Sequence, residues 1–156
     1  MLDTPISDKC VPFFNLNVAA GEFLSSPKDY NVHYIEIEEY MYNSADFFAC
    51  QITGESMNKI IPNNSVVLFK KYSGGSRNGE ICLVQSTDIQ DPDTGGEFTV
   101  KEYESKKAYD IDGWEHSEII LKPRSYDKSY KNIVLKSDEI TDFKVVGIYV
   151  RVLGEF

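Results

Sequence analysis

Residues 143–153 read FKVVGIYVRVL, a run rich in β-branched and aromatic residues that is typical of a β-strand. Five more runs of this kind occur along the chain: FFACQIT (47–53), SVVLFKK (65–71), EICLVQS (80–86), EFTVKEYE (97–104) and SEIILKP (117–123). Turn-forming residues separate them, as in PNN (62–64), SGGSRNG (73–79) and DPDTGG (91–96). This spacing predicts a mainly β domain with antiparallel or mixed strand pairing.

Helical periodicity is weak throughout the sequence. Only SMNKII (56–61) and KSDEI (136–140) are expected to form a short turn or two of helix. The 156 residues are enough for one domain with a sizeable core, and they contain no repeat or linker. We therefore predict an N-terminal arm over residues 1–25, followed by a single domain over residues 26–156.

Charge and hydropathy exclude several classes of function. The net charge of −9 and the pI near 4.7 argue against direct binding of a nucleic-acid backbone by this chain. No apolar run is long enough to span a membrane, and the first residues lack the pattern of a signal peptide. A cytoplasmic protein is expected.

The cysteines and histidines do not form a metal-binding pattern. Cys10, Cys50 and Cys82 are an odd set without a C-x-x-C spacing, which indicates reduced thiols. His33 and His116 are far apart and belong to no cluster of metal ligands. We expect neither a metal ion nor a cofactor.

The stretch ITGESMNKIIP (52–62) contains the candidate nucleophile Ser56. A serine is a poor nucleophile at neutral pH unless a base activates it, and neither histidine lies in a catalytic context. A neutral lysine is a recognised alternative base. Lys101, in the middle of the strand FTVKEY, is the candidate.

Strand alternation places Thr99, Lys101 and Tyr103 on one face of this strand. Lys101 is then either a solvated residue or one directed into an apolar site. Lowering the pKa of a lysine from about 10.4 to ~7 costs about 4–5 kcal/mol, which the fold would have to supply. From the pattern alone, the solvated orientation is the simpler interpretation.

A family resemblance favours the catalytic interpretation. Five segments occur in the order and spacing of the LexA/UmuD family of self-cleaving serine peptidases: GESMNKIIPNNSVVLF, RNGEICLV, FTVKEY, IILKPRSYDKSY and FKVVGIYVRV. The resemblance extends from about residue 11 to the C-terminus. It implies a LexA/signal-peptidase-like fold of twisted antiparallel or mixed sheets, with Ser56 as the nucleophile and Lys101 as the base.

The resemblance also indicates a substrate within the chain. NVAAGEF (17–23) resembles the cleavage-site loop of LexA-type repressors, in which the bond between alanine and glycine is cut. Here that bond is Ala20–Gly21, although an Ala-Gly pair is also common in flexible turns. The backbone N–H groups of Glu55 and Ser56 are the expected oxyanion donors, because the motif makes a tight turn.

Two features depart from the family pattern or have no role that the sequence reveals. Asn64 and Ser65 stand where family members commonly carry Gly-Asp. Asn58, two residues after the nucleophile, has no role that the sequence suggests.

The resemblance implies the regulatory domain of a LexA-like or prophage-type transcriptional repressor, which cleaves itself on a DNA-damage signal. The SOS-response co-activator would be a RecA-type filament, the domain would form a homodimer through residues 143–153, and DNA would be bound only by a separate N-terminal domain. The short arm also suits a UmuD-type translesion-polymerase accessory protein. A non-catalytic dimerisation and partner-binding module is the third alternative. The apolar arm, residues 11–25, should pack as extended chain on the domain.

Overall fold

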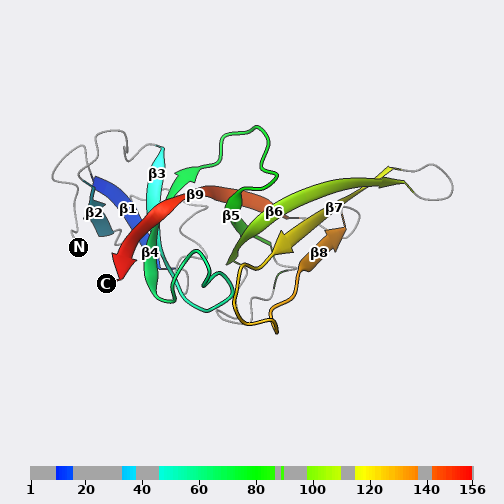
Figure 1. Cartoon of the computed structure of the whole chain (residues 1–156). Coiled ribbons are helices and arrows are strands. Elements are labelled where there is room, and N and C mark those ends of the chain that lie inside the picture. Colours follow the sequence, from blue (N-terminus) through cyan, green and yellow to red (C-terminus); the bar gives the residue numbers. More distant parts are fainter. Residues whose placement is uncertain are drawn as a thin grey trace.

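The computed structural model describes residues 10–15, 33–37, 46–86, 89, 98–109, 115–136 and 142–155. These residues form nine strands: β1 (Cys10–Asn15), β2 (His33–Glu36), β3 (Phe47–Ile52), β4 (Ser65–Lys71), β5 (Ile81–Gln85), β6 (Phe98–Tyr109), β7 (Glu115–Lys122), β8 (Ile133–Lys136) and β9 (Lys144–Glu155). The strands belong to one mixed sheet in the order β2-β1-β3-β4-β9-β5-β6-β7-β8 (Figure 1). The prediction of a mainly β fold is confirmed.

Strand β9 lies in the middle of this sheet and joins its two halves, β2-β1-β3-β4 and β5-β6-β7-β8 (Figure 1). Its residues from Gly147 to Glu155 pair with β4, and its residues from Lys144 to Ile148 pair with β5. Both ladders contain register shifts, which bend a strand and increase its twist. Apolar side chains of β9 pack against three separate core clusters, which accounts for the nearly continuous apolar character of residues 143–153.

Strands β1 and β3 form the one parallel pair among the described strands. Strand β1 pairs antiparallel with β2 but parallel with β3, where Asn15 lies opposite Gln51. Val11, Phe13 and Phe14 of β1 are buried. Residues 10–15 of the expected arm are therefore packed, extended chain within the sheet. The Ala20–Gly21 bond lies outside the described residues.

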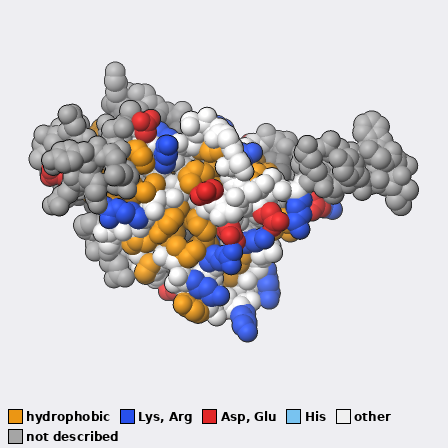
Figure 2. Space-filling model, turned by 45° about the horizontal axis from the view of Figure 1, so that its top comes forward, with side chains coloured by type: hydrophobic (Ala, Val, Ile, Leu, Met, Phe, Trp, Pro, Cys, Tyr) orange, Lys and Arg blue, Asp and Glu red, His pale blue; other side chains and the backbone are white. Residues whose placement is uncertain are grey.

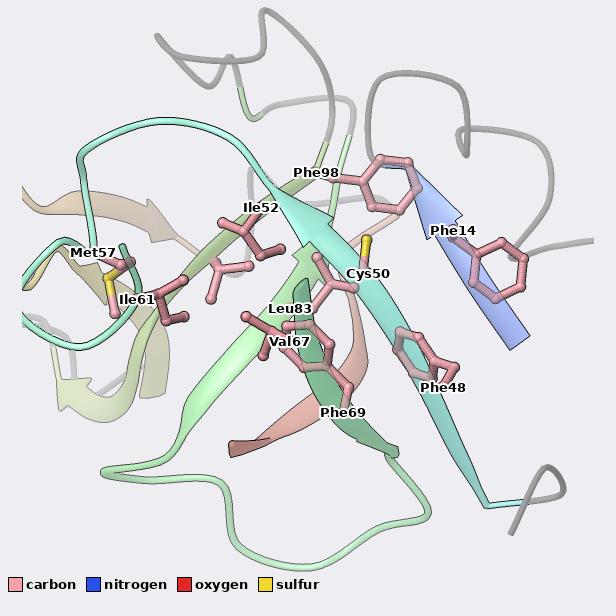
Figure 3. Close-up of a cluster of buried hydrophobic side chains, with 11 residues drawn as sticks. Phe14, Phe48, Cys50, Ile52, Met57, Ile61, Val67, Phe69, Leu83 and Phe98 are labelled. Atoms are coloured by element: carbon pink, nitrogen blue, oxygen red, sulfur yellow. The ribbon is translucent and has the colours of Figure 1, made fainter. Parts of the chain in front are cut away.

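The largest core cluster contains aromatic and aliphatic side chains from strands β1 to β6 of the sheet, without the edge strand β2 (Figure 3). The Phe48 and Phe69 rings stack with their centroids 5.5 Å apart. Met57 and Ile61, from the turn after β3, reach into the same cluster and are almost fully buried. These two side chains anchor to the core the turn that contains Ser56.

Hydrophobic surface also remains outside the core. Figure 2 shows hydrophobic side chains gathered near the middle of one face, with basic and acidic side chains distributed around them. In β9, Val146, Tyr149 and Val152 pack against the core but stay partly exposed. The sheet therefore leaves part of its central strand uncovered.

The expected helical turn over residues 56–61 is wrong, since the described residues contain no helix there. The Ile61 N–H does donate to Met57 O, four residues back, at 2.7 Å. The N–H of Ile60 donates to Met57 O as well, at 2.9 Å, and the N–H of Lys59 donates to Arg124 O in a separate loop at 2.9 Å, so the segment forms hydrogen-bonded turns joined to another part of the chain. The second expected helical piece begins at the last residue of β8, and residues 137–140 lie outside the described residues.

Candidate active site

Ser56 and Lys101 lie together in the folded chain. Lys101 Nζ donates a hydrogen bond to Ser56 Oγ at 3.0 Å, across 45 positions of sequence. Both residues are buried, with exposed fractions of 8% for Ser56 and 2% for Lys101. The solvated orientation of Lys101, which the sequence left open, is therefore excluded. Their catalytic roles remain a prediction.

Thr99 shares the face of β6 with Lys101, as the strand alternation predicted. Lys101 Nζ donates a second hydrogen bond to Thr99 Oγ1 at 2.5 Å. Thr99 is itself only 1% exposed. Two hydroxyl oxygens therefore fix the position of the lysine amine, and the aliphatic part of the side chain runs through the protein interior.

The segment from Thr53 to Asn64, here called the serine turn, needs unusual backbone angles. Gly54 has a φ of +113° and donates its N–H to Asn63 Oδ1 at 2.7 Å. Asn64 has a φ of +65° and donates its N–H to Ile52 O at 2.8 Å. Asparagine tolerates this left-handed conformation better than most residues, which explains how it replaces the usual glycine.

Ser65, the other departure from the family pattern, begins β4. Its side chain is fully buried, and its Oγ makes no hydrogen bond with the described residues. An unpaired buried hydroxyl costs about 1–3 kcal/mol of stability. This departure concerns stability, and the dyad does not involve Ser65.

The N–H groups of Glu55 and Ser56 make no hydrogen bond within the described part of the chain. The carbonyl of Ser56, in contrast, accepts a hydrogen bond from Arg124 N–H at 2.9 Å. Free N–H groups on a tight turn beside a nucleophile are the arrangement that an oxyanion hole requires.

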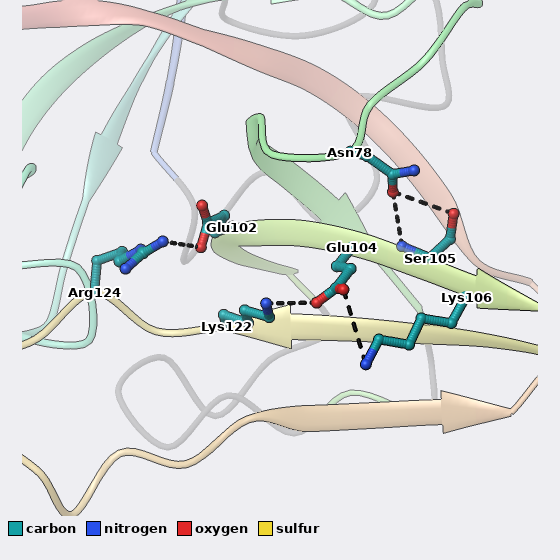
Figure 4. Close-up of polar contacts among 7 residues, drawn as sticks. All are labelled: Asn78, Glu102, Glu104, Ser105, Lys106, Lys122 and Arg124. Atoms are coloured by element: carbon teal, nitrogen blue, oxygen red, sulfur yellow. Dashed lines mark hydrogen bonds and ion pairs between the residues drawn. The ribbon is translucent and has the colours of Figure 1, made fainter.

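The loop that follows β7 connects the serine turn to the strand that carries Lys101. The Arg124 guanidinium forms an ion pair with Glu102 of β6, next in sequence to Lys101 (Figure 4). Lys122 pairs with Glu104 of the same strand at 2.5 Å, and this contact lowers the pKa of that exposed carboxyl below its ordinary value. The loop thus contacts Ser56 directly and, through Glu102, the strand that carries Lys101.

Asn58 has a structural partner that the sequence did not reveal. Its Nδ2 donates to Glu55 Oε2 at 3.0 Å, and its Oδ1 accepts from Tyr126 N–H at 2.9 Å. Tyr126 is 68 positions away, so only the folded chain brings this contact together.

The remaining candidates lie away from the dyad. His33 is exposed on β2 at one edge of the sheet, and His116 pairs with Ala108, seven positions along β6 from Lys101. In the described ranges, no group of three His, Cys, Asp or Glu residues is placed to hold a metal ion. Nor does that part of the chain contain a helix long and apolar enough to cross a membrane.

The described cysteines are buried, free thiols. Burial raises the pKa of the Cys50 thiol far above its ordinary value. Burial, helped by the charge of Glu80, raises the pKa of Cys82 to about 12. Thiols in this state are poor nucleophiles, because the thiolate is the reactive form.

A family model described as Peptidase S24-like matches residues 12–150 of the chain. The chain belongs to the Peptidase S24-like family. This is the LexA/UmuD-type family, so the resemblance found in the sequence is confirmed, and a peptidase-type domain follows from it. No curated protein matches the chain.

Proposed function

We propose that this Peptidase S24-like domain is a serine peptidase that cuts its own Ala20–Gly21 bond, with Ser56 as nucleophile and Lys101 as general base. The observation that carries the proposal is the buried 3.0 Å contact between Lys101 Nζ and Ser56 Oγ. Burial disfavours the charged form of an amine, and only the neutral amine can accept the serine proton.

The reaction is an acyl transfer. Ser56 Oγ attacks the Ala20 carbonyl carbon while Lys101 Nζ takes the hydroxyl proton. The N–H groups of Glu55 and Ser56, which have no hydrogen-bond partner among the residues that the structure describes, stabilise the oxyanion. The bond to Gly21 then breaks, and Lys101 returns the proton to the departing amine. Water, deprotonated by Lys101, hydrolyses the resulting ester.

The strand register favours cleavage within one chain. Asn15 lies opposite Gln51 in the parallel pairing of β1 with β3. Ala20 follows Asn15 by five positions, and Ser56 follows Gln51 by five positions. Strand β1 therefore runs in the same direction as β3, which leads to Ser56, and five extended residues can span up to about 17 Å. A tethered substrate has a high effective concentration and needs few binding contacts.

Intact-mass measurement over a pH series tests the proposed reaction. Cleavage should accelerate as the pH rises, because more Lys101 becomes neutral, and Gly21 should be the new N-terminus. Ser56→Ala and Lys101→Ala should each remain uncut, and the rate should not depend on protein concentration. A rate independent of pH, or a different new N-terminus, would contradict the proposal.

The biological role that we propose is the regulatory domain of a LexA-like or prophage-type repressor, with a RecA-type filament as co-activator. Adding such a filament on single-stranded DNA should accelerate the cut. A helix-turn-helix encoded in frame upstream of Met1 would support the proposed role as part of a repressor. Partial complementation of a translesion-polymerase defect by the cleaved chain would instead favour the UmuD-type role.

We further propose that the domain forms a homodimer through β9. The partly exposed Val146, Tyr149 and Val152 support this, because a second copy would cover them. Sedimentation showing only monomers at micromolar concentration would count against it.

A further inference from the structure

The amide of Asn58 uses both of its ends. Its nitrogen donates to the Glu55 carboxylate and its oxygen accepts from the Tyr126 backbone, at 3.0 and 2.9 Å. The side chain is only half-buried, so these bonds do not simply compensate for burial. An asparagine that bridges two separate segments in this way limits how those segments can move relative to each other.

The first of these bonds closes the backbone around the nucleophile. Glu55 and Asn58 flank Ser56 and Met57 in sequence, and the Asn58 N–H also donates to Glu55 O at 3.2 Å. The side-chain bond therefore reinforces a single long backbone bond. The peptide planes inside this closed turn set the directions of the Glu55 and Ser56 N–H groups, the proposed oxyanion donors.

The second bond fixes the turn to the loop after β7. Beside it, Arg124 N–H donates to Ser56 O, and Lys59 N–H donates to Arg124 O, both at 2.9 Å. The side chain of Arg124 pairs in turn with Glu102, the neighbour of Lys101 on β6 (Figure 4). Asn58 thereby completes a connection from the serine turn to the strand of the lysine.

We infer that Asn58 is a positioning residue for self-cleavage, which holds Ser56 Oγ and the oxyanion donors in register with Lys101. The inference rests on the proposed peptidase function. Asn58 itself touches no reacting atom. It acts through Glu55 and Tyr126, and its loss should misplace groups whose positions matter to within about 1 Å.

Asn58→Ala is the primary test, and Asn78→Ala is its matched control. Asn78 Oδ1 likewise accepts a backbone N–H, that of Ser105 on β6, at 2.8 Å, but it contacts neither the serine turn nor the loop after β7. Asn58→Ala should lower the maximal cleavage rate about 10- to 100-fold. The midpoint of its pH profile should change little, because Lys101 stays buried on β6 and keeps its hydrogen bond to Thr99. Asn78→Ala should cleave at the original rate.

A reversal of the bridge provides the rescue. Asn58→Asp places two carboxylates together and should be as slow as Asn58→Ala. Combining it with Glu55→Gln lets the new amide at position 55 donate to the new carboxylate at position 58. The double variant should cleave at least tenfold faster than Asn58→Asp alone. A merely structural role would change the melting temperature without this recovery.

Amide hydrogen exchange separates failure of this inference from failure of the proposed function. In Ser56→Ala chains, which should not cut, adding Asn58→Ala should increase exchange at the hydrogen-bonded amides of Lys59, Ile61 and Arg124 at least tenfold, and adding Asn78→Ala should not. If the chain never cleaves but exchange rises, the peptidase proposal fails and the positioning of the turn stands. If exchange and cleavage both stay unchanged in Asn58→Ala, or if Asn78→Ala slows cleavage equally, the inference is overturned.

Discussion

The two members of the dyad are held in place by different kinds of structure. Lys101 lies on a regular strand, where it pairs with Cys82 of β5, and the next residue, Glu102, pairs with Lys122 of β7. Ser56 lies on an irregular turn, whose shape depends on positive φ angles and on particular side-chain bonds. A strand position is fixed by many interchangeable backbone bonds. The turn depends on a few residues that cannot be exchanged.

This difference predicts unequal tolerance to substitution. On the lysine strand, only a change to the reacting side chain or its hydroxyl partners should matter. On the serine turn, changes that leave Ser56 itself intact should also impair the reaction.

The largest expected effect is that of Lys101→Met. Cleavage should fall below detection, by more than about 1,000-fold, because the base is lost. The free energy of unfolding should rise by about 0.5–2 kcal/mol, since an apolar side chain of similar length suits this buried site better. Intact mass and urea denaturation measure the two effects. A clear loss of stability would mean that the strand depends on Lys101. It would contradict the view that backbone pairing alone holds this strand in place.

A smaller effect is expected from Gly54→Ala in the serine turn. Alanine at a φ of +113° is strained and should lower the free energy of unfolding by about 1–3 kcal/mol. The turn should relax and slow cleavage about tenfold or more. Urea denaturation measures the change in stability, and intact-mass measurement over time gives the cleavage rate.

Gly75→Ala is the matched control for this substitution. Gly75 has a φ of +93° in the loop between β4 and β5, with open space where its Cβ would lie. Its stability loss should be similar, but its cleavage rate should not change. Equal slowing in both variants would show that the rate follows global stability and not the shape of the turn.

The smallest effect on cleavage is expected at the thiols. Cys50 on β3 and Cys82 on β5 both have pKa values raised by burial. Cys82 lies opposite Lys101 in the ladder between β5 and β6, but the two thiols donate to the backbone carbonyls of Gln51 and Glu80 and not to the dyad. Iodoacetamide at pH 8 should therefore leave both unlabelled in the folded chain and label both in urea. Peptide mass mapping distinguishes them. Rapid labelling of either one in the folded state would contradict its burial.

The same thiols set an upper limit for the pH series. Above the ordinary thiol pKa of 9.0, the unfolded chain loses protons that the folded chain retains. The free energy of unfolding should fall from about pH 9 upward, by as much as about 1.4 kcal/mol per pH unit for each thiol, until the folded pKa is reached. For Cys82 that window closes at about 12. Cleavage rates are therefore best compared below about pH 9, where this loss of stability begins.

Sequence patterns predicted β3, β4, β5 and β9 to within one or two residues, whereas the run predicted for β6 ends at residue 104 and the strand continues to Tyr109. The run SVVLFKK is β4, and the runs that gave β3, β5 and β9 differ from the observed strands by one or two residues at their ends. These segments are apolar enough to be buried wherever they lie in the sheet. The strands β2 and β8 have four residues each and were not predicted, because a run that short has little pattern of its own.

The sequence by itself determined the β class, the family, the identity of Ser56 and Lys101 as candidates, and the face that Lys101 shares with Thr99. These conclusions depend on residue type and local alternation, which the chain carries in any surroundings. Only the tertiary structure decided that Lys101 is buried, that its amine meets Ser56, and that Asn58 bridges Glu55 and Tyr126. In the sheet order, β4, β9 and β5 separate the strand before Ser56 from the strand of Lys101. Contacts across such separations form through packing of the whole sheet and leave no local pattern in the sequence.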